Sequence, residues 1–435
     1  MDEYNPNDKK IRIIILIIFL IISFILEQFY NNYLFEKSLE IEEYLFKTTP
    51  NKIILFFKFI THFGSQTFII PLIIILFFAF PLHLSYLFIS LIIYTCYFNG
   101  ILKIFYSNPR PFWLKNEIMR KCEGSYGNPS GHSFMSFAVY LSLWKVCMNY
   151  DYFNKNFLGK ILKFLSLFFT IVFCLFILLS RIYLCVHSIN QIIYGSSFGL
   201  ALFYYYFYVL KFNEMNGKKF FNFIQEKKNL KLQTIKFSLY LLILFLIYTF
   251  KNDNKIKNTY NEILLEICPK IKEYRKFKND GIFNGLSIFF IIGAHYGLYF
   301  FLNKVLIYKP YKDEEINNWN IGGDKIGFIK RILILIPMGS PMILYLIFPD
   351  KNINLFFIYL FKVVIPYFLT GFCLFGLYIY CIIKLKIGYV KIYDNFRFGT
   401  EVENDSYFPK IKDVNISGDD GAVPVKLKKN VNIDN

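Results

Sequence analysis

Long apolar runs alternate with short polar connections along the first 386 residues of the chain. A helix of about 20 apolar residues is long enough to cross the hydrocarbon core of a bilayer. The pattern predicts ten such helices, at residues 12–30, 67–82, 84–106, 132–149, 161–183, 188–210, 233–250, 282–303, 329–348 and 355–386. A further apolar stretch, residues 52–62, is too short to span and is expected to form an interfacial or buried half-helix. The predicted fold class is therefore all-α, in a polytopic membrane protein.

Composition agrees with this pattern and excludes disordered and collagen-like classes. Of the 435 residues, 55% are hydrophobic and 18% are charged, against roughly 45–50% apolar and about 25% charged in soluble domains. The net charge of +18 would suit a nucleic-acid binder, but the Lys residues are scattered between apolar runs rather than gathered on one face. We therefore expect membrane lipids, and no nucleic acid, among the partners of this protein.

The distribution of basic residues predicts the orientation in the membrane. Lys and Arg favour cytoplasmic connections, and they are frequent at the amino terminus, in residues 211–232 and in the tail, whereas residues 36–43 carry four Glu. Both termini are then expected to be cytoplasmic. The connection 251–281 does not fit this orientation, because it is rich in Lys but would lie on the extracytoplasmic side. Its five acidic residues partly offset that charge.

The eight Cys residues show no metal-binding pattern. None has the CxxC spacing of a metal-ligand pair, and most lie inside apolar runs, where a thiol is usually a small buried hydrophobe. Only Cys122 and Cys268 lie in hydrophilic connections. A disulfide between these two is compatible with the sequence, which offers no support for it, and the pairing stays open.

The first of three polar segments at membrane boundaries is residues 103–111, KIFYSNPRP. Lys103 falls in the last turns of an apolar helix, and Pro109 disfavours a helical conformation of Asn108. Arg110 is therefore expected in a loop just beyond the helix, so that two cations lie near one membrane face. The alternative is that both side chains extend to the lipid head groups, as Lys and Arg at helix ends commonly do.

The second segment, NPSGH, opens a new apolar helix. Asn128 suits the N-cap and Pro129 the first helical position. The backbone N–H groups of Ser130 and Gly131 would then be unpaired and able to bind an anion. His132 would lie in the first turn, where it can supply a proton. The alternative is an ordinary capped helix with an incidental His.

The third segment is residues 180–195, SRIYLCVHSINQIIYG, at the junction of two apolar helices. Arg181 and His187 flank the junction, and Gln191 falls four residues after His187 on the same helical face. Of the five His residues in the chain, two lie in these segments. The others lack a cationic or Gly-rich setting and are expected to be structural: His62, His83 and His295.

The order and spacing of the three segments are more specific than any one of them. Lys-x6-Arg-Pro, then Pro-Ser-Gly-His, then Ser-Arg-x5-His resembles the motif set of the type 2 phosphatidic acid phosphatase superfamily, over about residues 60–210. The resemblance implies a six-helix catalytic core, with His187 as the nucleophile and His132 as the general acid. It also implies that phosphate is held by Lys103, Arg110, Ser130, Gly131 and Arg181. The phosphatase branch of this family uses no metal or other cofactor.

One position departs from the common family pattern. Many members have Asp four residues after the nucleophilic His, where this chain has Gln191. A Gln carbonyl can fix the imidazole tautomer without adding charge. The glucose-6-phosphatase and dolichyl pyrophosphate phosphatase branches resemble this chain in having Gln. Gln191 is therefore interpreted as a branch marker at a third catalytic position.

The predicted organisation has three parts: a catalytic membrane core at residues 1–210, about four additional membrane helices at 211–386, and a flexible cytoplasmic tail at 387–435. The resemblance implies a metal-independent phosphatase that cleaves a phosphate monoester through a phosphohistidine. A site at bilayer level favours a phosphorylated lipid, with a sugar phosphate or a polyprenyl diphosphate as alternatives. A transporter and a non-catalytic relative stay open as other classes. We expect residence in the endoplasmic reticulum rather than the plasma membrane, with the active site lumenal or extracytoplasmic.

Overall fold

The structure, a computed structural model, is described over most of the first 381 residues. The described residues are 6–79, 82–148, 153, 156–212, 217–250, 263–264, 266–268, 277–304, 325–347, 355–378 and 380–381. They form helices and no strand, which confirms the predicted all-α class. The chain divides into two compact units, Met1–Gly399 and Thr400–Asn435, and every described residue lies in the first. The predicted tail, residues 387–435, lies outside the described residues.

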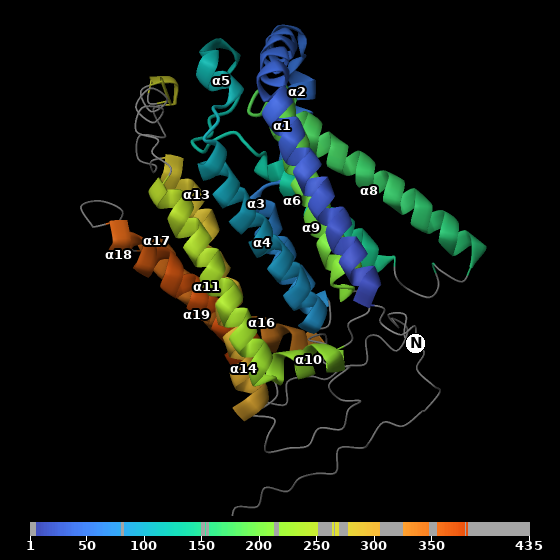
Figure 1. Ribbon diagram of the computed structural model, residues 1–435, viewed down its shortest axis with the longest axis vertical. Helices are drawn as coiled ribbons and strands as arrows, with labels where there is room; N and C mark the ends of the chain where they lie inside the picture. Colours follow the sequence, from blue (N-terminus) through green and yellow to red (C-terminus); the bar gives the residue numbers. More distant parts are fainter. Residues whose placement is uncertain are drawn as a thin grey trace, which may run out of the picture. The chain divides into compact units, whose positions relative to one another are not determined.

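The helices of the first half build a bundle around α4, α6 and α9. In order they are α1 (Pro6–Thr48), α2 (Asn51–His62), α3 (Gln66–Ala79), α4 (Leu82–Tyr106), α5 (Pro111–Leu114), a 3₁₀ turn (Asn116–Ile118), α6 (Gly131–Cys147), α8 (Phe157–Tyr183), α9 (Ile189–Tyr204) and a π-helical turn (Tyr205–Val209). Helix α9 packs against α6 and α1, while α6 also contacts α4 and α8. Helix α2 packs on α8 (Figure 1).

The helices of the second half pack on this bundle through α4. They are α10 (Gly217–Gln225), α11 (Lys227–Phe250), α13 (Phe277–Leu286), α14 (Ile288–Lys304), α16 (Lys325–Gly339), a 3₁₀ turn (Ser340–Met342), α17 (Ile343–Ile347), α18 (Leu355–Tyr359), a π-helical turn (Leu360–Val364), α19 (Ile365–Phe372) and a second π-helical turn (Cys373–Leu377). Helix α13 lies against α4. A Cβ at Gly100 would collide with the Gly281 carbonyl oxygen, so glycine permits this close approach.

Seven of the described helices are long and apolar enough to cross a membrane. They are Asn7–Thr48, Leu82–Leu114, Phe157–Tyr183, Ile189–Val209, Lys227–Phe250, Gly281–Asn303 and Phe356–Leu377. The other three predicted spans are helical over residues 66–79 (α3), 131–147 (α6) and 325–347 (α16, the 3₁₀ turn and α17) of the described chain. At 1.5 Å per residue the 17 residues of α6 reach only about 26 Å, short of a hydrocarbon core of about 30 Å.

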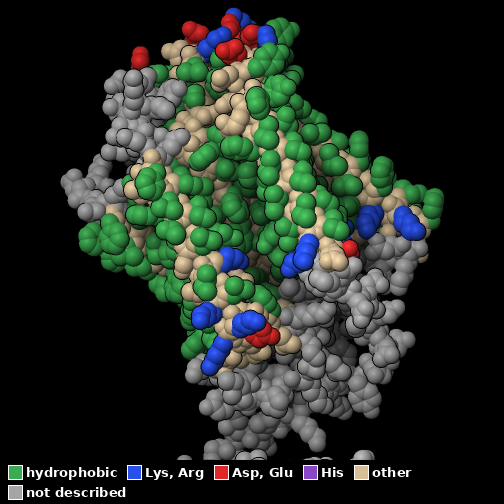
Figure 2. Space-filling view, in the orientation of Figure 1, with side chains coloured by type: hydrophobic (Ala, Val, Ile, Leu, Met, Phe, Trp, Pro, Cys, Tyr) green, Lys and Arg blue, Asp and Glu red, His purple; other side chains and the backbone are tan. Residues whose placement is uncertain are grey.

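The surface fits a multi-pass membrane protein. Hydrophobic side chains cover most of the face drawn in Figure 2, whereas charged side chains gather toward its two ends. Many apolar side chains of α1 and α8 are exposed, such as Ile14 and Phe168, each 54% exposed. Such a surface is unfavourable in water but suits lipid. The chain is therefore an integral membrane protein.

One detail of the predicted first half is changed, the end of its first helix. The acidic residues 36–43 belong to α1, which continues to Thr48 instead of ending near residue 30. The ion pairs Lys37–Glu40 and Lys47–Glu43 have the i,i+3 and i,i+4 spacings that favour a helix beyond the apolar run. Residues 52–62 are helical, as expected, within α2; their interfacial position stays a prediction.

Candidate active site

The three polar segments meet at one end of the helix bundle. Lys103 and Arg181 lie in the last turns of α4 and α8, and Arg110 directly precedes α5. Figure 1 shows α2 and α5 at this end, and α10 at the opposite end. Cys122 and Cys268, whose pairing the sequence left open, form a disulfide at this end. That bond joins the connection between α5 and α6 to the segment between α11 and α13.

His187 is oriented by Gln191. Its Nδ1 lies 3.1 Å from Gln191 Oε1, while Gln191 Nε2 donates to the Pro109 carbonyl at 2.8 Å. Because a carbonyl oxygen can only accept, the amide nitrogen must face Pro109, and Oε1 then accepts from His187 Nδ1–H. This contact forms although His187 precedes α9 instead of lying on it. The tautomer with a lone pair on Nε2 is selected, as a nucleophile requires.

Arg110 and Lys103 are buried and directed toward His187. Arg110 Nη1 lies 3.1 Å from His187 Nε2 and donates to the Val186 carbonyl at 2.9 Å. Arg110 Nη2 and Lys103 Nζ both donate to the hydroxyl of Ser125, at 2.9 and 3.0 Å. Both cations are at least 94% buried, since Lys103 is 6% and Arg110 1% exposed. The alternative that they extend to lipid head groups is therefore wrong.

Arg181, the third cation, is fully buried at the end of α8. Its Nη1 donates to Thr61 Oγ1 at 2.6 Å, and its Nη2 pairs with Glu123 Oε1 at 2.6 Å. Glu123 Oε2 in turn pairs with Arg110 Nη1 at 2.7 Å. One carboxylate thus joins the two arginines that the family pattern assigns to phosphate. Sequence reasoning missed Thr61 and Glu123, because both lie outside the three segments.

The second segment departs from the predicted cap. Helix α6 begins at Gly131 with Ser130 as its N-cap, instead of having Asn128 as cap and Pro129 in the first turn. The cause is tertiary: the Ser130 N–H donates to the Gln191 carbonyl at 2.9 Å. The Ser130 amide, expected to be unpaired, therefore joins the second segment to the third. Phosphate binding by the Gly131 N–H stays a prediction.

His132 is the second residue of α6 and lies within reach of the same charges. Its Nε2 is buried and has no hydrogen-bond partner among the described residues. Burial and the positive charge of Arg181 lower the pKa of its imidazole well below its usual range, against the opposing charge of Glu123. The negative charge of a bound phosphate is therefore needed to protonate it. Buried polar atoms usually have partners, so this nitrogen is suited to exchange a proton with a bound substrate oxygen.

The electrostatic setting keeps His187 neutral. Burial lowers the pKa of His187 well below its usual range, and the positive charges of Arg110, Arg181 and Lys103 lower it further. The negative charge of Glu123 opposes this shift and is outweighed. A neutral imidazole at physiological pH leaves Nε2 able to attack phosphorus.

A polar network on α1 fastens all three segments. Glu27 Oε1 accepts hydrogen bonds from Asn128 Nδ2 at 2.6 Å and from Asn190 Nδ2 at 3.0 Å. Asn31 Oδ1 accepts from Asn190 at 3.1 Å and from Asn108 at 3.4 Å. Each of these three partner asparagines belongs to a different segment. Charged side chains inside a membrane helix are costly unless they serve a function, and that signal could have identified Glu27, whereas Asn31 lies just beyond the predicted apolar run.

A close contact between α6 and α9 sets the spacing of the second and third segments. A Cβ added at Gly195 would lie 2.5 Å from the Ser130 carbonyl oxygen. No side chain fits there without moving the backbone of the second segment. Glycine at residue 195 is therefore required by the distance between the two segments.

Proteins of known families are similar in sequence to this part of the chain. Residues 82–215 match the PAP2 superfamily, the type 2 phosphatidic acid phosphatases. Dolichyldiphosphatase from Saccharomyces cerevisiae is 32% identical over 118 residues, 26% of this chain and 46% of that protein, so the chain spans about half of this curated relative.

Among solved structures, the first transmembrane PAP2 type phosphatidylglycerolphosphate phosphatase, from Bacillus subtilis, is 24% identical and has a TM-score of 0.38. The match covers 47% of this chain and 96% of that one. The matched residues 82–215 contain all three segments and both His residues. The match of residues 82–215 to the PAP2 superfamily confirms the resemblance seen in the motifs.

Proposed function

We propose that the protein is a metal-independent membrane phosphatase that cleaves the phosphate monoester of a lipid through a phosphohistidine on His187. One observation carries the proposal. His187 Nε2 lies 3.1 Å from Arg110 Nη1, while the opposite ring nitrogen is held by Gln191. A nucleophilic nitrogen beside a cation that can bind the phosphate under attack is what phosphoryl transfer needs.

The reaction follows from the chemistry of the five assigned groups. Arg110, Arg181 and Lys103 bind the nonbridging phosphate oxygens and stabilise the charge that spreads over them in the transition state. His187 Nε2 attacks phosphorus as the bond to the lipid oxygen breaks, and His132 gives its proton to that oxygen. Water then attacks the phosphohistidine, His132 takes a proton from the water, and phosphate leaves. Because three side chains supply the positive charge, the scheme requires no metal ion.

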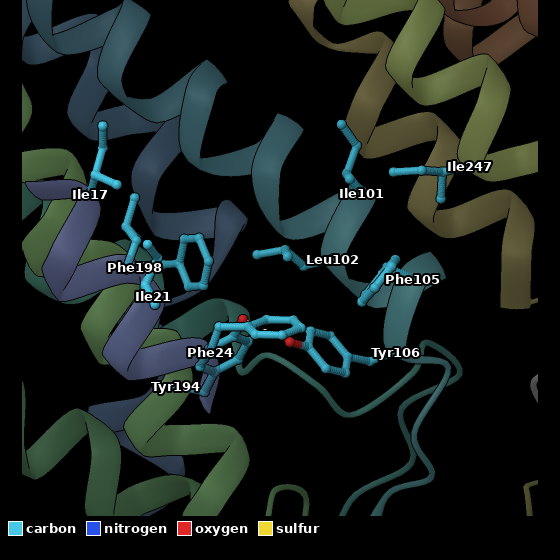
Figure 3. Close-up of a pocket in the computed structure, with 11 residues that line it drawn as sticks. Ile17, Ile21, Phe24, Ile101, Leu102, Phe105, Tyr106, Tyr194, Phe198 and Ile247 are labelled. Atoms are coloured by element: carbon cyan, nitrogen blue, oxygen red, sulfur yellow. Dashed lines mark hydrogen bonds between the residues drawn. The ribbon is translucent and has the colours of Figure 1, made fainter. Parts of the chain in front are cut away.

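An apolar groove supports a lipid as the substrate. It has a volume of about 440 Å³ and is lined by side chains of α1, α4, α9 and α11, including Phe24 from α1 and Ile247 from α11 (Figure 3). At one end the hydroxyl groups of Tyr106 and Tyr194 lie 2.8 Å apart. Tyr106 precedes Arg110 by only four residues. A hydrocarbon chain in this groove would leave its phosphate near the cations.

A polyprenyl diphosphate is a second candidate substrate, favoured by the similarity to dolichyldiphosphatase. The same attack on a terminal phosphorus would release a lipid monophosphate instead of an alcohol. A monophosphate is a better leaving group and needs less help from an acid. Loss of His132 should therefore slow a diphosphate reaction less than a monoester reaction.

The proposal extends to the orientation of the active site. The boundary of α10 and α11 carries five Lys residues within residues 217–231, and α10 lies at the end opposite α5. Basic connections favour the cytoplasm. The motif end is then lumenal or extracytoplasmic, with the endoplasmic reticulum as the proposed membrane.

The test is phosphate release by the purified full-length chain in detergent, with a chelator and without magnesium. The substrates are a phosphatidate, a sphingoid-base phosphate, dolichyl diphosphate and glucose 6-phosphate. We expect cleavage of a lipid phosphate that is lost in His187→Ala and retained in His62→Ala, an exposed His on α2. Cleavage that requires added magnesium, or that survives in His187→Ala, would contradict the proposal.

A further inference from the structure

The carboxylate of Glu123 occupies donors that a substrate phosphate needs. Its Oε2 lies 2.7 Å from Arg110 Nη1, and its Oε1 lies 2.6 Å from Arg181 Nη2. Arg110 Nη1 is also the nitrogen that lies 3.1 Å from His187 Nε2. The carboxylate therefore lies beside the nucleophile, on the charged donors of the proposed phosphate site.

Glu123 is ionised in this position. Burial by itself raises the pKa of its carboxyl, but the positive charges of Arg181, Arg110 and Lys121 outweigh burial and hold that pKa well below its usual range. A phosphate group that shared the same two guanidinium groups would face a second anion a few ångströms away. Such repulsion is strong where solvent screening is weak.

We propose that Glu123 is an internal competitor of phosphate: its carboxylate holds Arg110 and Arg181 in the empty site and releases both when a phosphate group binds. This inference rests on the phosphatase function proposed above. It adds a residue that sets how tightly the site binds phosphate. Removal of the carboxylate charge should therefore strengthen phosphate binding, although it removes the three ion pairs of Glu123.

Lys121 gives the displaced carboxylate a partner nearer to solvent. Its Nζ pairs with Glu123 Oε1 at 2.9 Å, and its side chain is 42% exposed, compared with 17% for Glu123. The two arginines are buried. Rotation of the Glu123 side chain toward Lys121 moves the carboxylate away from the arginines and keeps one ion pair.

The backbone on both sides of Glu123 is fastened, so the side chain has to move. Cys122 is held by the disulfide to Cys268, and Arg120 donates to the Tyr183 carbonyl at 2.6 Å. On the other side, the Ser125 carbonyl accepts from Arg110 Nε at 2.6 Å. Opening of the whole connection would break these bonds, whereas a side-chain rotation breaks only the two ion pairs to the arginines.

The test measures binding of inorganic phosphate to the full-length protein in detergent micelles by isothermal titration calorimetry. Glu123→Gln keeps the shape of the side chain and removes its charge, so phosphate affinity should rise by about tenfold or more, the scale of one charged hydrogen bond. Glu117→Gln is the matched control, because it makes the same change at an exposed residue of the same connection. Its phosphate affinity should equal that of the wild type.

Lys121→Gln provides a second measurement with the opposite sign. Without Lys121 the carboxylate stays on the arginines, so phosphate should bind more weakly than to the wild type. Combined with Glu123→Gln, the Lys121 change should have no effect, since it acts through the carboxylate. An effect of Lys121→Gln that persists in the double variant would overturn the role of Lys121.

If Glu123→Gln binds phosphate with an affinity equal to or lower than that of the wild type, the proposal is overturned. Glu123 would then only hold the two arginines in the orientation that binds phosphate. If that variant does not fold, unchanged or tighter binding by Lys121→Gln overturns it instead. Binding of inorganic phosphate needs no turnover. A gain in affinity without any lipid phosphate hydrolysis would therefore support the competitor and refute the phosphatase.

Discussion

Replacement of Gln191 by Ala tests how the nucleophile is prepared. The Gln191 amide accepts from His187 Nδ1–H at 3.1 Å and donates to the Pro109 carbonyl at 2.8 Å. In Gln191→Ala, Nδ1 loses its acceptor and the imidazole can take the other tautomer, in which Nε2 carries a proton and cannot attack. We expect slower phosphoryl transfer with phosphate binding largely retained, because the three cations stay in place.

The size of the effect follows from these two hydrogen bonds. Loss of the partner that orients a metal-bound imidazole typically reduces activity roughly 10–100-fold, and we expect the same range here, or about 1.4–2.7 kcal/mol of transition-state stabilisation. The half-buried Pro109 carbonyl, left without its donor, lowers the free energy of unfolding by about 0.5–1.5 kcal/mol, the net worth of one hydrogen bond. The variant should therefore lose both stability and activity per folded molecule.

The assay is single-turnover labelling of the phosphoenzyme, normalised to folded protein by size-exclusion chromatography. Gln225→Ala is the matched control, because Gln225 ends α10 and donates to the Leu302 carbonyl at 3.4 Å, outside the site. Wild-type specific activity in folded Gln191→Ala would refute the reasoning and leave Gln191 with a structural role only.

Gln191→Asp changes the charge at the same position. Its carboxylate can accept from His187 and should keep activity, as in family members with Asp. The added negative charge raises the pKa of His187, so the nucleophile is protonated at higher pH and the acidic limit of the pH profile shifts upward. Because Asp cannot donate to the Pro109 carbonyl, this variant should also unfold more easily. An unchanged acidic limit would contradict the predicted contact.

Four further predictions follow from the site and the topology. His187→Ala should abolish turnover and phosphoenzyme labelling by a radiolabelled lipid phosphate; labelling equal to the wild type would exclude this nucleophile. Glu27→Ala should lower the free energy of unfolding by about 1–3 kcal/mol because Asn128 Nδ2 loses its acceptor, whereas Asn190 Nδ2 keeps Asn31 Oδ1, and Glu27→Gln, which keeps an acceptor, should recover most of it in thermal denaturation. Gly195→Ala should reduce kcat and cost about 1–3 kcal/mol of stability through overpacking; wild-type values of both would show that the helices can separate. Asn404 and Asn415, in the sequons NDS and NIS, should carry no glycan in a eukaryotic host because the tail is expected to be cytoplasmic, and a glycosidase-sensitive mass shift would invert the topology.

The charged residues of the three segments could be predicted because they interrupt long apolar runs. Arg110, His132 and His187 each stand at a helix boundary, and their order and spacing match the family pattern. Apolar runs of about 20 residues likewise predict the long helices. The start of a helix is less predictable near Gly and Pro, since α6 starts only at Gly131 instead of after the predicted cap at Asn128.

Contacts between distant segments could not be predicted in the same way. The Ser130 amide is bound by the carbonyl of Gln191, 61 residues away, which shifts the start of α6. Glu123 lies in a connection with several other charged residues, and its partner Arg181 is 58 residues further along the chain. The preference of a residue for helix or turn depends on its sequence neighbours and carries no information about such distant pairs. Glu27 was easier to predict from the sequence, because a carboxylate within an apolar helix is conspicuous without knowledge of its partners.

The disulfide between Cys122 and Cys268 bears on the compartment of the reaction. Thiols are kept reduced in the cytosol, whereas disulfides persist in the secretory pathway and outside the cell. A crosslink adjacent to Glu123 therefore favours an oxidising compartment for the phosphate site, independently of any count of basic residues. A phosphatase in that orientation would release phosphate away from the cytosolic pool, so a separate transport step would have to return it.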